Sequence, residues 1–175
     1  MVSPTISIHP KLLLQAIEKV GKPLGLVNFG QATMNMMRLE HGYKVWGREL
    51  TLDTNPYESG LGGLVDLNKK DFIGRSSAVE HAKAEFNRRL SIIAFEPSAE
   101  TAVNIPAGFE VVRREGEEKR IGQITSGAYS VRLQKPIAFA WLDNSVNTND
   151  KVQVDFGGAT LEATVVESLD HARIH

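Results

Sequence analysis

Cysteine is absent from the 175 residues of this chain, which excludes disulfides and thiolate metal sites. An excess of either charge is also missing. The formal net charge is -1 and the pI is about 6.5, so we expect no nucleic-acid partner. No apolar run approaches the ~20 residues that a membrane helix needs, and the N-terminus lacks the basic and apolar regions of a signal peptide. We therefore expect a cytoplasmic protein without a membrane partner.

Several motifs that carry chemistry are missing as well. There is no Walker loop, no H-E-x-x-H zinc motif and no G-x-S-x-G nucleophile elbow. The glycine-rich run at residues 60–63 does not follow a strand and open a helix, so we reject a nucleotide site. The five histidines are scattered without metal-ligand spacing, which predicts no metal site. Spacing also pairs none of the carboxylates into an acid–base couple, so we assign no catalytic residue.

The first half of the chain has mixed helical and extended patterns. Apolar residues at helical spacing predict helices over residues 11–20 and 31–41. Residues 64–67 resemble a buried strand. Ser77 followed by Glu80 fits a capping box, which predicts a helix that closes at Arg88 and Arg89.

The second half favours short strands without a long helix. Apolar and alternating runs predict strands over residues 90–95, 109–113, 120–125, 137–142, 151–156 and 160–166. Gly157 and Gly158 between the last two runs are a strong hairpin signal. The spacing predicts a small sandwich or barrel, so we place a boundary near Asn87 and divide the chain into residues 1–87 and 88–175. The fold class is α+β.

Arg38 lies near the edge of the apolar side of the second predicted helix. It could be a surface arginine paired with Glu40 or Glu49. It could instead direct its planar guanidinium at a ligand carboxylate, to which it can donate two parallel hydrogen bonds. Spacing alone leaves both interpretations open. The nearby methionines can line a cofactor site, although such a cluster usually belongs to a core.

Five ordered motifs resemble the folate-binding aminomethyltransferase family, the glycine cleavage T-protein fold. The motifs are RLEHGY at 38–43, WG at 46–47, DTNPYESGL at 53–61, DFIGR at 71–75 and TSGAYS at 125–130. The sequences of these motifs are most similar to the C-terminal portion of dimethylglycine and sarcosine dehydrogenases. The resemblance covers about residues 10–168.

This resemblance implies the C-terminal part of a three-lobed fold, an α/β segment followed by a small antiparallel β-barrel. It implies a tetrahydrofolate site, to which Arg38 and Tyr43 are the residues carried over by motif position. Tyr43 could stack near the pterin or aminobenzoate ring, or it could be a core aromatic. FAD is implied only for a longer parent protein, and the mitochondrial matrix only for a eukaryotic parent.

In the family, the catalytic aspartate and the carboxylate that binds the pterin belong to the N-terminal half, which no residue here matches. The resemblance therefore implies one-carbon transfer from an amine to tetrahydrofolate only in a full-length protein. The isolated chain should be inactive, with the missing N-terminal half or a partner subunit completing it. The alternative is a non-catalytic module that kept the fold and binds a partner or regulates one.

Overall fold

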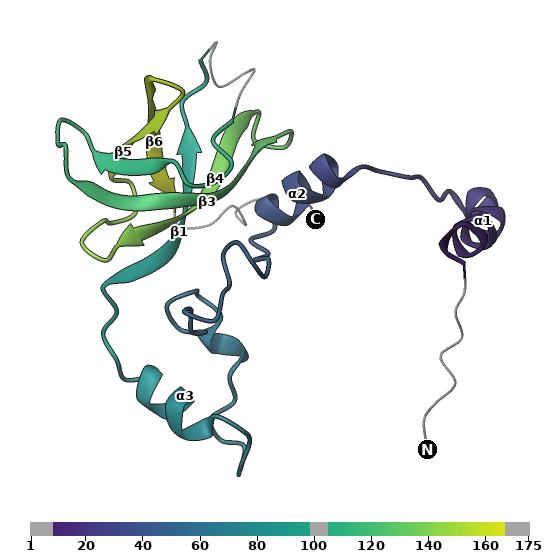
Figure 1. The fold of residues 1–175 in the computed structure, drawn as a ribbon, viewed down its shortest axis with the longest axis horizontal. Helices are drawn as coiled ribbons and strands as arrows, with labels where there is room; N and C mark the ends of the chain where they lie inside the picture. Colours follow the sequence, from purple (N-terminus) through teal and green to yellow (C-terminus); the bar gives the residue numbers. More distant parts are fainter. Residues whose placement is uncertain (1–8, 99–104, 167–175) are drawn as a thin grey trace. The chain divides into compact units, whose positions relative to one another are not determined.

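The computed structural model of the chain describes residues 9–98 and 105–166 (Figure 1). The chain divides after Gln31 into two compact units. The first unit contains α1 (Pro10–Gly21) and the short 3₁₀ helix η1 (Lys22–Leu24). Pro10 occupies the first helical turn of α1, where a missing N–H costs nothing. None of the residues of α1 is buried, and Leu13 and Ile17 on its apolar side are 47% and 49% exposed.

The second unit is built around a closed barrel of antiparallel strands, which wrap around one another in Figure 1. The strands are β1 (Arg88–Phe95), β2 (Val111–Arg114), β3 (Arg120–Ser130), β4 (Lys135–Asp143), β5 (Lys151–Phe156) and β6 (Ala159–Val166). Around the barrel they follow the order β1-β4-β3-β2-β5-β6, and β6 closes on β1. Closure removes the unpaired edges of an open sheet. The predicted all-β second half is confirmed as a barrel.

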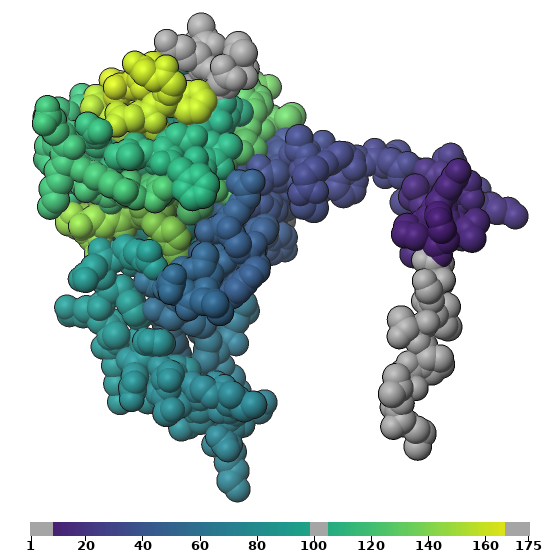
Figure 2. All heavy atoms as spheres, viewed as in Figure 1, coloured from purple at the N-terminus to yellow at the C-terminus, as the bar shows by residue number. Residues whose placement is uncertain are grey.

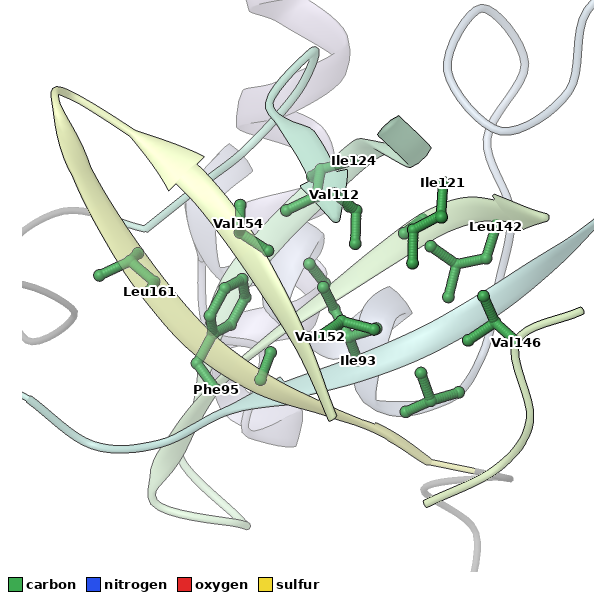
Figure 3. Packing of buried hydrophobic residues seen from close by; sticks show 14 residues of the cluster. Ile93, Phe95, Val112, Ile121, Ile124, Leu142, Val146, Val152, Val154 and Leu161 are labelled. Atoms are coloured by element: carbon green, nitrogen blue, oxygen red, sulfur yellow. The ribbon is translucent and has the colours of Figure 1, made fainter. Parts of the chain in front are cut away.

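The barrel is filled by the inward side chains of every strand. Figure 3 shows Ile93, Phe95, Val112, Val152 and Val154 directed into this interior. All five are at most 1% exposed. Along β5 the buried residues alternate with partly exposed ones, as expected of a strand with one face on a core. Burial of these side chains, at about 25 cal/mol per Å² of apolar surface, stabilises the barrel.

The hairpin between β5 and β6 turns at the predicted glycine pair. Gly157 has φ 57° and Gly158 has φ 86°, and the strands pair from Phe156 with Ala159 onward. Two successive residues with positive φ make the type I′ geometry that matches strand twist, and glycine adopts it without a steric penalty. Here local sequence determines the strand register.

The part of the second unit before the barrel has little regular structure. It contains α2 (Gln31–Glu40), the 3₁₀ helix η2 (Gly62–Leu64) and α3 (Arg75–His81). The predicted strand at 64–67 is wrong, because Leu64 ends η2 with 82% of its surface exposed. The predicted helix from Ser77 to Arg89 is also wrong in its bounds. Gly74 precedes the first turn, the helix ends at His81, and Arg88 and Arg89 pair with β4 instead.

Segment 41–60 packs on the barrel, as the blue atoms against the green ones show in Figure 2. Leu90 donates its backbone N–H to Glu58 O at 3.1 Å. The Arg88 side chain donates to both Glu58 carboxylate oxygens, at 3.3 and 3.4 Å. Glu58 in turn accepts the backbone N–H of Asn55 at 3.1 Å. These contacts hold the irregular segment at the start of β1.

None of the helices in the described part of the chain has the length and apolar character that crossing a bilayer requires. The described residues also hold no group of three or more His, Asp or Glu side chains that could bind a metal ion. His171 and His175 lie outside the described residues. The predicted division after Asn87 falls inside the second unit and stays a prediction.

Candidate functional site

Arg38 forms an ion pair with Glu49 inside the second unit. Its Nη1 donates to Glu49 Oε2 at 2.9 Å, and the side chains are 8% and 0% exposed. Arg38 also donates from Nε to Asn35 Oδ1 at 2.9 Å, and from Nη1 to Tyr43 O at 3.2 Å. Its Nη2 donates to Ser126 Oγ at 2.5 Å. Of the two interpretations offered by spacing, the pairing with Glu49 is present, but it is buried rather than on the surface.

Glu49 connects this segment to strand β3. Its Oε1 accepts from Thr125 Oγ1 at 2.8 Å and from Ser126 Oγ at 2.5 Å. Its Oε2 accepts the backbone N–H of Val45 at 2.9 Å in addition to Arg38. Both carboxylate oxygens of this buried side chain therefore have hydrogen-bond donors from the protein, as buried polar groups require. The network joins residues 38–49 to residues 125–126.

Two cations near Glu49 have perturbed pKa values. Burial lowers the pKa of Arg38, and the Glu49 carboxylate partly offsets this effect. Burial also lowers the pKa of Lys44, again with an opposing contribution from Glu49. An arginine stays charged even so, since its ordinary pKa is far above neutrality. Glu49 therefore carries the negative charge that makes burial of Arg38 tolerable.

Tyr43 is on the surface, with 68% of its area exposed. Its ring stacks on His41, with the ring centroids 6.1 Å apart. Trp46 is 66% exposed. Tyr43 is therefore not a core aromatic, which was the alternative that sequence left open. Its main-chain carbonyl is held by Arg38, so the two residues predicted for a cofactor site lie together.

The other buried carboxylates of the described residues are also bound by their own chain. Glu40 accepts from Ser130 Oγ at 2.5 Å and from the backbone N–H of Arg132 at 3.2 Å. Glu58 binds Asn55 and Arg88. A general acid or base must reach a substrate proton, and these three glutamates reach groups of the protein instead.

A pocket of about 600 Å³ lies beside this network. Segment 47–54 and the loop at 107–110 form two of its walls, and β1, β3 and β4 contribute the rest. Its side chains include Arg48, Asp53, Arg88, Phe109 and Trp141. Sequence reasoning did not select Arg48, Arg88 or Trp141. No spacing signal could have found them, because the fold brings them together from segments about 40 and 50 residues apart.

Comparison with protein families gives two matches. Residues 88–169 match the glycine cleavage T-protein C-terminal barrel domain, and residues 8–69 match the GCVT N-terminal domain. The ion-pair network joins the two matched regions, because Arg38 and Glu49 belong to one and Ser126 to the other.

Curated relatives include dimethylglycine dehydrogenase, mitochondrial, of Homo sapiens, at 36% identity over 157 residues. That match covers 89% of this chain and 17% of the relative. The aminomethyltransferase of Thermotoga maritima is 38% identical over 157 residues, which is 89% of this chain and 39% of the relative. That of Chloroherpeton thalassium is 34% identical over 161 residues, with 91% and 42% covered. The chain thus spans less than half the length of each.

A crystal structure of the glycine cleavage system aminomethyltransferase T from Bartonella henselae has the same fold. It superposes with a TM-score of 0.76 at 22% sequence identity, covering 90% of this chain and 43% of that one. The predicted architecture, an α/β segment followed by a small antiparallel barrel, is confirmed.

Proposed function

Since the chain belongs to the folate-dependent aminomethyltransferase family and matches its C-terminal region, we propose that it completes a one-carbon transfer unit. In the full-length protein this unit passes a one-carbon group from an amine to tetrahydrofolate. The observation that carries the proposal is that both halves of the chain match successive domains of one family. The buried Arg38–Glu49–Ser126 network supports it, because it joins residues 38–49 of the first matched region to the barrel of the second.

Tyr43 and Arg38 are the residues that we propose for the folate site. Folate offers flat rings and carboxylates, and the exposed Tyr43 ring, stacked on His41, suits contact with a flat ring. Arg38 would serve the site mainly by holding the Tyr43 carbonyl, since four of its hydrogen bonds go to the protein. A guanidinium has five N–H donors, so one donor is left for a ligand carboxylate. Folate supplies the one-carbon acceptor when it is bound.

The chain by itself should be inactive, or nearly so. Glu40, Glu49 and Glu58 are bound by their own chain, so none is poised to move a substrate proton. We propose that the N-terminal half, or a partner subunit, supplies the acid–base carboxylate. FAD would belong only to a longer dehydrogenase parent. The mitochondrial matrix is the proposed location for a eukaryotic parent, and the cytoplasm otherwise.

Calorimetry with tetrahydrofolate tests this site. We expect binding by the chain and a loss of affinity of about tenfold in Tyr43→Ala, from the lost ring contact. Arg38→Ala should lose at least as much, with folding checked by circular dichroism. Tyr129→Ala is the matched control, because Tyr129 is also partly exposed (42%) but lies on β3. If neither substitution changes tetrahydrofolate affinity, Arg38 and Tyr43 do not belong to the folate site. Measurable one-carbon transfer by the chain alone would contradict the proposal that the isolated chain is inactive.

A partner-binding module is the second candidate, and one observation favours it. Leu13, Ile17 and Val20 of α1 are 47%, 49% and 68% exposed. Residues four apart lie on one side of a helix, so Leu13 and Ile17 form part of a continuous apolar stripe. Such a stripe is typical of a surface that another protein covers. This candidate needs no catalysis and no folate.

A further inference from the structure

The 600 Å³ pocket beside the buried network is a separate site from the proposed folate contacts, because neither Arg38 nor Tyr43 lines it. Its volume falls in the range of about 300–1,000 Å³ that small-molecule sites have. Gly47 and Gly108 are part of its wall, where the lack of a side chain leaves room for a ligand. The pocket is therefore large enough for a small metabolite.

Two of the four charged side chains that line the pocket are satisfied by the protein. Glu110 accepts the backbone N–H of Gly108 at 2.8 Å and that of Ala107 at 3.2 Å, and so supports its own loop. Arg88 pairs with Glu58 and donates to the Asp53 carbonyl at 3.2 Å. Because of these contacts, neither Glu110 nor Arg88 requires a charged group of a ligand as a partner.

The other two charged side chains are Arg48 and Asp53. Like Glu110 they form no ion pair among the described residues, but the Asp53 carboxylate, unlike that of Glu110, accepts no hydrogen bond from them, since the bonds of Asp53 involve only its main chain. The Arg48 guanidinium donates from Nη1 to two main-chain carbonyls, Ala107 O at 3.0 Å and Thr125 O at 3.4 Å. This anchors the group across the pocket wall, while its remaining N–H donors have no hydrogen-bond partner in the part of the chain that the structure describes. The pocket thus offers one cation and one anion to a ligand.

Aromatic rings provide the apolar part of the same pocket. The Arg88 guanidinium lies 4.5 Å from the centroid of the Trp141 ring, which holds that ring in place. Phe109 is 86% exposed and has φ 76°, a backbone region that bulky residues rarely adopt. The loop at 107–110 therefore keeps the Phe109 ring exposed beside the pocket rather than packed in a hydrophobic core. Strained residues of this kind recur at ligand-binding positions.

We propose that this pocket binds a free amino acid with a flat apolar side chain, recognised as a zwitterion. Arg48 receives the carboxylate, Asp53 receives the ammonium group, and the ring lies against Trp141 and Phe109. A ligand with both charges satisfies both unpaired side chains, whereas a simple anion would be repelled by Asp53 and a simple cation by Arg48. The proposal does not depend on folate binding.

Titration of the ¹⁵N-labelled chain with L-phenylalanine tests it, with the Trp141 indole N–H as the reporter. Trp46→Phe identifies that signal, since the chain has two tryptophans. We expect saturable shifts at Trp141. Two probes each lack one charge: 3-phenylpropionate has no ammonium group and 2-phenylethylamine has no carboxylate. Each should bind at least about tenfold more weakly, because each loses the hydrogen bonds to one charged group of the pocket.

Arg48→Gln and Asp53→Asn should each weaken phenylalanine binding by a similar factor while the barrel signals stay in place. Arg75→Gln is the matched control, because Arg75 also donates to main-chain carbonyls, those of Leu67 and Lys69, and lines none of the described pockets. It should bind like the unmodified chain. The proposal is overturned if phenylalanine gives no saturable shift, or if either single-charge probe binds as well as phenylalanine. It is also overturned if both pocket variants bind normally.

Discussion

At the scale of single residues, burial decides how much an ion pair contributes. Arg38 and Glu49 are 2.9 Å apart at 8% and 0% exposure. Arg113 and Asp155 are closer, at 2.7 Å, but are 36% and 40% exposed. Water screens the second pair and not the first. The shorter distance therefore belongs to the weaker interaction.

We expect Glu49→Ala to destabilise the second unit by about 3–5 kcal/mol, because it leaves the buried Arg38 cation without its partner. Thr125 and Ser126 would lose their common acceptor as well. Urea denaturation followed by far-UV circular dichroism measures this. Asp155→Ala is the control and should cost at most about 1 kcal/mol. Equal losses in the two variants would show that burial is not the deciding factor.

At the scale of elements, strand β3 and the loop before β2 approach each other so closely at Gly127 that no side chain fits there. A Cβ on Gly127 in β3 would overlap Pro106 O, and it would lie 3.2 Å from Ile105 Cγ2. Gly127 O also accepts the side-chain amide of Asn35 at 3.0 Å, which attaches α2 to this strand. The glycine thus allows a loop and a helix to meet at one point of β3.

Gly127→Ala should therefore destabilise the barrel by about 1–3 kcal/mol, the usual effect of overpacking. Thermal unfolding monitored by circular dichroism would register a lower melting temperature. Gly63→Ala is the matched control, because a Cβ added at Gly63 would meet nothing within 4 Å and the φ of this residue is not positive. It should be neutral or slightly stabilising. A Gly127→Ala variant as stable as the Gly63→Ala variant contradicts the prediction.

Helices and strands that are specified by nearby turn residues and apolar spacing were predicted well from sequence, whereas elements that depend on distant partners were not. The glycine pair at 157–158 and the apolar runs around it specify a hairpin by themselves. By contrast, residues 64–67 have the composition of a buried strand, yet no strand of the described residues pairs with them. Arg88 and Arg89 suit a helix end, but pairing with β4 places them in β1.

At the scale of the whole molecule, the two proposed functions differ in how the chain associates. The exposed stripe of Leu13, Ile17 and Val20 has a different consequence under each proposal. If the missing half of a one-carbon transfer unit covers it, the isolated chain should self-associate without a fixed stoichiometry. We expect this behaviour in sedimentation velocity, with the mean mass rising with concentration. The double variant Leu13→Glu/Ile17→Glu should stay monomeric. Lys19→Glu, a charge change in the same helix, is the control and should associate like the unmodified chain.

A clean monomer or a defined oligomer at all concentrations would contradict the proposal of an incomplete one-carbon transfer unit and favour the partner-binding module. That outcome leaves the family and the fold unchanged, because they rest on the matched sequence and on the barrel. It would alter only the role of the chain within a larger assembly.

The sequence by itself determined the α+β class, the strands of the barrel, its final hairpin and the family motifs, because these depend on local spacing and turn chemistry. Only the tertiary structure decided that Arg38 is buried against Glu49 and that Tyr43 is exposed. It also brought Arg48, Asp53 and Trp141 to one pocket. Burial and long-range contact are properties of the packed chain, and no spacing along the sequence encodes that Arg38 and Arg48 will contact residues 125–126 of β3.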